Sequence, residues 1–109
     1  SRLDTNIVKF ISKKESVKEI INEAILNVSL LSDLKNVKIE TNLSDSFIIC
    51  DYKWQIEALT NILKNSIEQS YENNKVLIES SENNAYVKII IKDFGTGIAK
   101  EDINEELNK

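Results

Sequence analysis

Hydrophobic side chains recur along most of the chain at the spacing of helices or of strands. Between residues 17 and 34 they return every three or four positions, which predicts a helix. Ser16 is its expected N-cap, with Glu19 at the third position after the cap. A longer segment, 51–71, has the strongest helical periodicity, and Asp51 is its expected N-cap. Both helices are therefore expected to pack an apolar face on a core.

Four shorter segments have the pattern of strands. Apolar and polar residues alternate over 37–43, and a short apolar run follows at 47–50, so we expect these two strands to pair. Residues 75–80 and 85–93 predict a hairpin around a polar turn at 82–84. The second strand of this hairpin is apolar almost without interruption, which favours a position near the middle of a covered sheet.

These elements predict an α/β fold, a two-layer sandwich in which helices cover one face of a mixed sheet. A chain of 109 residues fits one domain. Residues 1–10 have no core of their own and are expected to be a linker or the end of a preceding helix, whereas 11–109 carry the domain.

Composition narrows the possible functions. The net charge is -4 and the 14 basic residues are scattered, which argues against a nucleic-acid partner. The single cysteine, Cys50, cannot form an internal disulfide and lies in an apolar run, which predicts a core position and a reducing, cytoplasmic setting. No stretch reaches the roughly 20 apolar residues of a membrane span, although the chain can be one piece of a membrane-anchored protein. With no histidine, a histidine-based triad, metal site or phosphoacceptor within this chain is excluded.

Two motifs could carry chemistry. Asn61 and Asn65 lie one helical turn apart on a polar stripe, and Asp93 ends a strand just before the only two glycines, Gly95 and Gly97. Taken singly, the first is most simply a solvated helix face and the second an ordinary turn. Their order along the chain, an asparagine-bearing helix followed by a hairpin that ends in Asp-x-Gly-x-Gly-Ile, matches a nucleotide site.

With these motifs the chain resembles the ATP-binding catalytic domain of sensor histidine kinases, within the larger group of GHKL (Bergerat-type) ATPases. The segment 61–68, Asn-Ile-Leu-Lys-Asn-Ser-Ile-Glu, is similar to the N box of that family, with Ser66 where alanine is usual. Asp93 to Ile98 is similar to its first glycine box, and residues 1–4 to the end of the dimerisation helix that precedes such domains. The resemblance covers essentially the whole chain.

The resemblance implies ATP and Mg²⁺ as cofactors. It implies that Asn65 ligates the metal, that Asn61 lies beside the phosphates and that Asp93 accepts a hydrogen bond from the adenine amino group. Gly95 and Gly97, followed by Ile98, would let the backbone pass close under the base. An amide at position 61 cannot act as a general base near neutral pH, which favours phosphoryl transfer over hydrolysis.

The family continues beyond this point into a lid and a second glycine box, whereas here only residues 99–109 follow Ile98. The chain is therefore expected to be the N-terminal portion of the catalytic domain, inactive as a fragment, in a longer protein-histidine kinase. The implied partners are the dimerisation and phosphoacceptor domain of the same kinase, a second copy in a homodimer, and the receiver domain of a response regulator. Two alternatives remain open: a serine kinase or regulator of the anti-sigma-factor type with the same fold, and a nucleotide-free interaction module.

Overall fold

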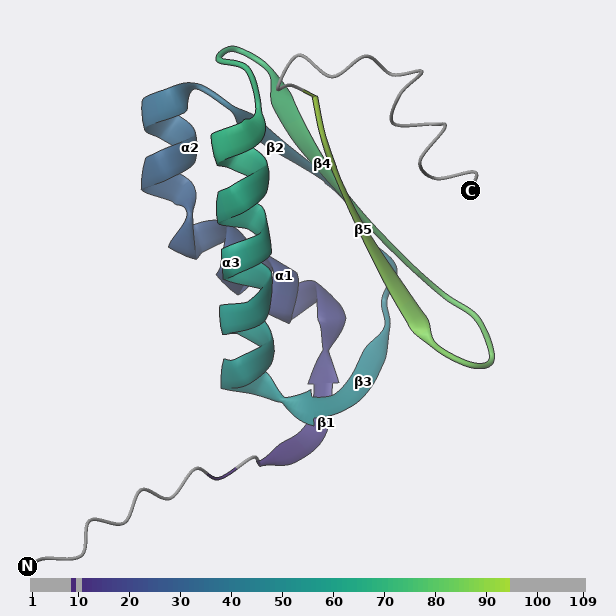
Figure 1. Cartoon of the computed structure of the whole chain (residues 1–109). Coiled ribbons are helices and arrows are strands. Elements are labelled where there is room, and N and C mark those ends of the chain that lie inside the picture. Colours follow the sequence, from purple (N-terminus) through teal and green to yellow (C-terminus); the bar gives the residue numbers. More distant parts are fainter. Residues whose placement is uncertain (1–8, 10, 95–109) are drawn as a thin grey trace, which may run out of the picture.

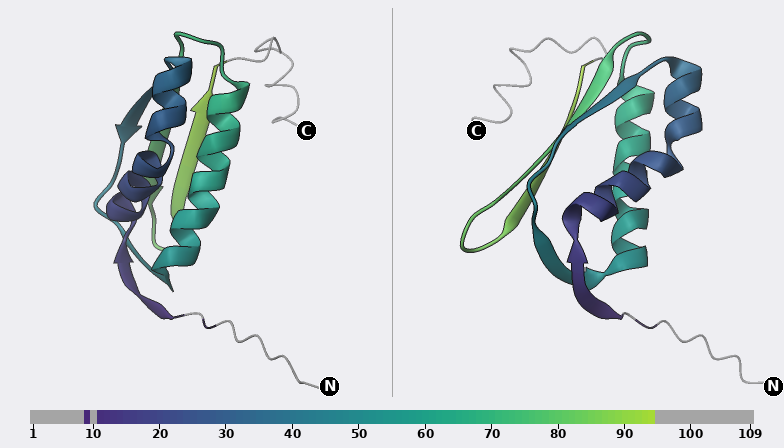
Figure 2. Two further views of the ribbon diagram at one scale, coloured as in Figure 1. Left: turned by 90° about the vertical axis from the view of Figure 1, so that its left-hand side faces the viewer. Right: turned by 180° about the vertical axis from the view of Figure 1, so that it is seen from behind.

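The computed structural model describes Lys9 and residues 11–94, and within them helices pack on one face of a sheet (Figures 1 and 2). The sheet has the order β2-β4-β5, with β2 parallel to β4 and β5 antiparallel to it. A separate antiparallel pair is formed by β1 and β3. The helices are α1 (Val17–Asn27), α2 (Ser29–Lys35) and α3 (Tyr52–Gln69), and the strands are β1 (Ser12–Ser16), β2 (Lys38–Asn42), β3 (Phe47–Asp51), β4 (Lys75–Glu82) and β5 (Val87–Asp93). The predicted α/β class, with a mixed sheet covered by helices on one face, is confirmed.

The core lies between this sheet and the helices α1 and α3. Leu59, Leu63 and Ile67, which are four residues apart, form the buried side of α3. Val76 and Ile78 face them from β4, the central strand of the described sheet. The remaining buried apolar residues are Val17, Ile20, Ile21, Ala24, Val28 and Val37. This packing fixes which side of α3 turns to solvent.

Both predicted helix caps are confirmed. The Ser16 hydroxyl accepts a hydrogen bond from the Glu19 amide at 3.2 Å, and Asp51 accepts one from the Trp54 amide at 3.1 Å. The second carboxylate oxygen of Asp51 also accepts a bond from the Ile11 amide at 2.6 Å, which ties the start of β1 to the start of α3. These bonds satisfy amide groups that a helix end would otherwise leave without partners.

The single helix predicted over 17–34 is wrong: the structure has two helices, with a break at Val28. The backbone of Val28 leaves the helical region at φ -108° and ψ 8°. Ser29 explains part of the break, because its hydroxyl donates to the carbonyl of Leu26 at 2.9 Å and so competes with helical bonding. The turn keeps Val28 buried while the chain changes direction, which a repeat of apolar positions cannot reveal.

The predicted pairing of 37–43 with 47–50 is also wrong. Both strands exist, but β2 pairs with β4 and β3 pairs with β1, a strand over 12–16 that the polar sequence does not indicate. The intervening loop separates them, because the buried Ser46 accepts a bond from the Val17 amide at 2.9 Å. Ser44, in the same loop, is held to Ser80 of β4 by an amide-to-hydroxyl bond of 2.9 Å. The loop is thus anchored in the core rather than turned back as a hairpin.

The hairpin of β4 and β5 is confirmed, and Asn83 holds its turn by accepting bonds from the Ala85 and Tyr86 amides at 2.7 and 3.0 Å. Its second strand was expected in the middle of the sheet, yet among the described residues β5 is an edge strand. Its three isoleucines are only half-buried, and of these Ile89 and Ile91 pack against the core. Contact with the core on one face explains the apolar residues at these two positions, whereas Ile90 points to the opposite face of the strand.

Cys50 is half-buried rather than fully buried, and packs against the core as expected for a small apolar residue. Burial, followed by the nearby carboxylates of Glu15 and Asp51, raises the pKa of its thiol. In the part of the chain that the structure describes, no helix is long and apolar enough to cross a membrane.

Candidate functional site

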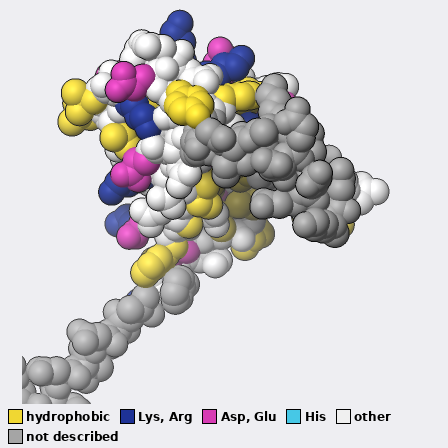
Figure 3. All heavy atoms as spheres, turned by 45° about the horizontal axis from the view of Figure 1, so that its top comes forward, with side chains coloured by type: hydrophobic (Ala, Val, Ile, Leu, Met, Phe, Trp, Pro, Cys, Tyr) yellow, Lys and Arg dark blue, Asp and Glu magenta, His cyan; other side chains and the backbone are white. Residues whose placement is uncertain are grey.

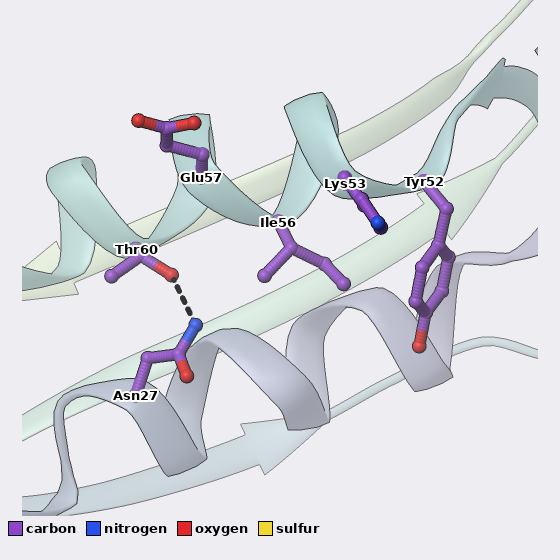
Figure 4. A pocket seen from close by; sticks show the side chains of 6 residues that line it. All are labelled: Asn27, Tyr52, Lys53, Ile56, Glu57 and Thr60. Atoms are coloured by element: carbon purple, nitrogen blue, oxygen red, sulfur yellow. Dashed lines mark hydrogen bonds between the residues drawn. The ribbon is translucent and has the colours of Figure 1, made fainter. Parts of the chain in front are cut away.

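Helix α3 presents Asn61 and Asn65 to solvent. Because Leu59 and Leu63 face the core, the residues at 57, 61 and 65 lie together on an outer side of the helix. Both asparagines are exposed, so their amide groups are free of the core and accessible to a ligand. The Glu57 side chain points away from α1 in Figure 4. Asn61 and Asn65 follow Glu57 in the sequence at intervals of about one helical turn.

The serine that departs from the family pattern lies on the other side of this helix. Ser66 is only 8% exposed and faces the core, next to Ile67. Its backbone carbonyl accepts bonds from the amide and the hydroxyl of Ser70 at the helix end. The substitution of serine for alanine therefore leaves the exposed asparagine pair unchanged.

The end of β5 presents Asp93. This carboxylate is exposed, and Asp93 is the last residue of the strand, paired with Val76 of β4. Phe94, directly after it, is half-buried, and its carbonyl accepts a bond from the Asn74 side chain at 2.8 Å. Because α3 packs on β5, the fold brings the asparagine-bearing helix and the aspartate-bearing strand together. Gly95, Gly97 and Ile98 lie outside the described residues.

Asn61 lines a shallow pocket of about 250 Å³ with Trp54, Glu57 and Ala58. Trp54, which sequence reasoning left without a role, is 45% exposed and lies two helical turns before Asn61. It also borders a second hollow near the start of β1, lined by Ile11 and Lys13 among others. The seven-residue spacing between Trp54 and Asn61 is the sequence signal that could have placed this tryptophan beside the candidate site.

A different groove, of about 330 Å³, lies between α1 and α3 (Figure 4). Tyr52 and Ile56 point from α3 toward α1, and Asn27 of α1 donates a bond to the Thr60 hydroxyl at 3.1 Å. Burial, with the carboxylates of α1 and β1 nearby, raises the pKa of Tyr52. The residues that line this groove include none of the predicted site residues.

The metal prediction can be tested against the donors that are present. In the described part of the chain, no three histidine, cysteine or carboxylate groups gather as they would around a fully protein-bound ion. The exposed amide oxygen of Asn65 is a neutral, hard ligand, which suits Mg²⁺ that keeps water and phosphate oxygens as its other ligands. The residues therefore fit a metal ion that arrives with a nucleotide.

The charge around α3 is mixed. Basic and acidic side chains are interspersed on the face shown in Figure 3. Glu68, one turn from Lys64, is exposed on α3 and offers a negative charge that would repel phosphates. Lys35 lies near the end of the same helix, where its ammonium group donates to the carbonyls of Ile67 and Glu68 at 3.0 and 2.5 Å. Because charges of both signs are interspersed among the described residues, phosphate binding would have to rest on particular groups.

Comparison with known proteins gives one consistent result. No family model matches the chain. The sensor protein kinase GraS of Staphylococcus aureus (strain Newman) is 29% identical over 89 residues, which cover 81% of this chain and 25% of GraS. The chain thus spans about a quarter of the length of the curated relatives that it matches.

Solved structures agree on the fold. The catalytic domain of the histidine kinase ThkA superposes with a TM-score of 0.74 at 22% identity, over 84% of this chain and 65% of that one. ThkA in complex with the response regulator protein TrrA gives a TM-score of 0.73 at 21% identity, over 90% and 30%. Full-length ShkA in complex with AMPPNP gives 0.70 at 17%, over 86% and 21%. The chain is thus similar in sequence to a sensor protein kinase, and it has the fold of the catalytic domains of histidine kinases.

Proposed function

We propose that the chain binds ATP with Mg²⁺ and serves as the nucleotide-binding part of a protein-histidine kinase. The observation that carries this proposal is the placement of two exposed amides on α3, packed against the strand that ends in the exposed Asp93. The comparisons support the kinase because the relatives and structural neighbours described above are histidine kinases. They favour it over a serine kinase of the anti-sigma-factor type and over a nucleotide-free module.

Asp93 is the proposed adenine-recognising group. Its carboxylate only accepts hydrogen bonds, so it pairs with the amino group of adenine and meets the carbonyl of guanine as acceptor against acceptor. Gly95 and Gly97, together with Ile98, are proposed to line the base, because a backbone without Cβ atoms can pass close to it.

Asn61 and Asn65 are proposed to face the phosphates. The Asn65 amide oxygen would hold Mg²⁺, which when bound neutralises phosphate charge and orients the transferred group. Asn61 would donate a hydrogen bond from its amide to a phosphate oxygen. Since an amide cannot remove a proton from water near neutral pH, the pair favours phosphoryl transfer over hydrolysis.

The γ-phosphoryl group is proposed to pass to a histidine outside this chain, which contains none. The acceptor would lie on the dimerisation domain of the same kinase, in a homodimer, and a response regulator would then receive the group. The complex of the structural neighbour ThkA with the response regulator protein TrrA supports a response regulator as one of these partners. A cytoplasmic location would follow from these partners.

Nucleotide binding can be tested by calorimetry with AMPPNP and Mg²⁺. Asp93→Ala is expected to weaken binding at least about tenfold, the contribution of a hydrogen bond to a charged group. Asn65→Ala is expected to weaken binding only when Mg²⁺ is present. Asp33→Ala and Asn22→Ala, at exposed positions on α2 and α1, are the matched controls.

Binding that Asp93→Ala leaves unchanged would exclude the assigned base site. The kinase class has its own assay, in which the longer protein expected to contain this chain is incubated with radiolabelled ATP. Acid-labile label on that protein is expected, because a phosphorus–nitrogen bond hydrolyses in acid. Acid-stable label on serine would favour the serine kinase instead.

A further inference from the structure

One residue, Asn74, joins the ends of all three strands of the described sheet. Its carbonyl accepts a bond from the Lys38 amide of β2 at 3.0 Å. Its side-chain oxygen accepts one from the Lys75 amide of β4 at 3.0 Å, and its side-chain nitrogen donates to the Phe94 carbonyl at 2.8 Å. Both the acceptor and the donor of the amide are thus used.

The bond to Phe94 continues the sheet past the point where regular pairing stops. The regular register of β4 and β5 ends at Val76 opposite Asp93. Beyond it, the Lys75 amide is turned toward the Asn74 side chain, so it cannot extend the ladder to Phe94. The Asn74 side chain supplies a donor to the Phe94 carbonyl in its place.

The loop before β4 positions Asn74 for its hydrogen bond to Phe94. Asn73 has a left-handed backbone, φ 65°, which reverses the chain after α3, and the Asn74 amide bonds the Tyr71 carbonyl at 3.3 Å. Asn74 is half-buried, and its bond to Phe94 is partly shielded from water. A shielded bond holds its geometry better than one that competes with solvent.

We propose that Asn74 is a positioning residue that sets the selectivity of the site for adenine over guanine nucleotides. By fixing the Phe94 carbonyl, it fixes the strand end from which Asp93 presents its carboxylate. This inference rests on the proposed function, since it assigns Asp93 to the base. A hydrogen bond weakens steeply with misalignment. A displaced Asp93 carboxylate is therefore expected to lose its preference for adenine over guanine while the chain stays folded.

The test compares two isosteric substitutions on the same hairpin. Asn74→Asp keeps the acceptor for Lys75 and removes the donor to Phe94, whereas Asn83→Asp adds the same charge at the opposite turn and keeps both of its acceptor bonds. Asn74→Ala removes the donor without adding charge. Affinities for ATP and GTP are measured by calorimetry with Mg²⁺, and the fold of each variant is checked by far-ultraviolet circular dichroism.

The ratio of ATP to GTP affinity is the decisive quantity. Both Asn74 variants are expected to lower it roughly threefold to tenfold, and Asn83→Asp to leave it unchanged. In an Asp93→Ala background, replacing Asn74 is expected to change the ratio no further, because Asn74 acts through Asp93. A purely structural role would weaken ATP and GTP equally.

The failures can be told apart. If the wild-type chain prefers ATP and the Asn74 variants keep that preference, the inference is overturned and the proposed function stands. If the ratio still changes in the Asp93→Ala background, Asn74 does not act through Asp93 and the inference is again overturned. A wild-type chain that binds neither nucleotide overturns the proposed function and this inference with it.

Discussion

Two neighbouring residues of α3 provide a direct test of the described packing. Leu63 is 1% exposed and belongs to the core, whereas Ile62, the preceding residue, is 49% exposed. The two side chains have the same number of carbon atoms and the same hydrophobic character. Truncating each to alanine therefore compares a core position with a surface position on one helix.

The structure sets the size of the expected difference. Truncating a buried leucine to alanine lowers the free energy of unfolding by about 2–5 kcal/mol, because the transfer free energy of the removed atoms is lost and a cavity remains. Ile62 keeps about half of its surface in water, so its truncation is expected to cost about 1 kcal/mol or less. For a domain of this size, the Leu63 variant should melt roughly 10 °C or more below the wild type.

Urea unfolding followed by circular dichroism measures the loss of unfolding free energy in both variants. The comparison holds if the slope of that free energy against urea concentration is the same in both. The Ile62→Ala variant serves as the control for the change of helix propensity and for the loss of apolar side-chain atoms on the same helix. Equal losses in the two variants would refute the assigned orientation of α3. Since this orientation places Asn61 and Asn65 in solvent, the proposed site would be refuted with it.

Two further predictions concern local structure. Hydrogen bonds from the amides of Ile11 and Trp54 lower the pKa of Asp51 below its usual 3.8, so its stabilising effect is complete above that pH and is lost as the pH falls through the lowered pKa. The free energy of unfolding is measured with urea for the wild type and for Asp51→Asn at about pH 6 and about pH 3. The wild type is expected to be the more stable of the two at about pH 6 and to lose part of that advantage at about pH 3. An equal difference in unfolding free energy at both pH values would contradict this prediction. Asn73→Ala is expected to be about 1 kcal/mol less stable than Asn73→Gly, because the alanine Cβ is crowded at φ 65° and glycine has no Cβ; equal unfolding midpoints would contradict the left-handed assignment.

Local patterns were sufficient to predict helix α3, the strands other than β1, and the exposed side of α3. The periodicity of 51–71 gave α3 to within two residues at its end, because a four-residue repeat of apolar positions has one way to face a core. Ser16 and Asp51 marked the helix starts, since a side-chain acceptor there bonds an amide three residues later. The turn of the β4–β5 hairpin followed in the same way from its asparagines.

Such local patterns could not predict contacts between residues that are far apart in the sequence. The strand pairing of β2 depends on Asn74 and Lys38, which are 36 residues apart, and the alternation of 37–43 fits any neighbouring strand equally well. The polar strand β1 forms because β3 offers it an edge, and the break at Val28 keeps that residue in the core. Strand β5 lies at the edge of the described sheet because β4 is its only neighbour among the described strands.

The candidate site shows the same division. Sequence patterns were enough to predict that Asn61 and Asn65 share one side of a helix and that Asp93 ends a strand, because each follows from the repeat of a single element. Only the tertiary structure brought that helix against that strand and gave Asn74 its bond to Phe94. The physical reason is that helical and strand periods act within a few residues, whereas the position of α3 relative to β5 is set by how the core packs.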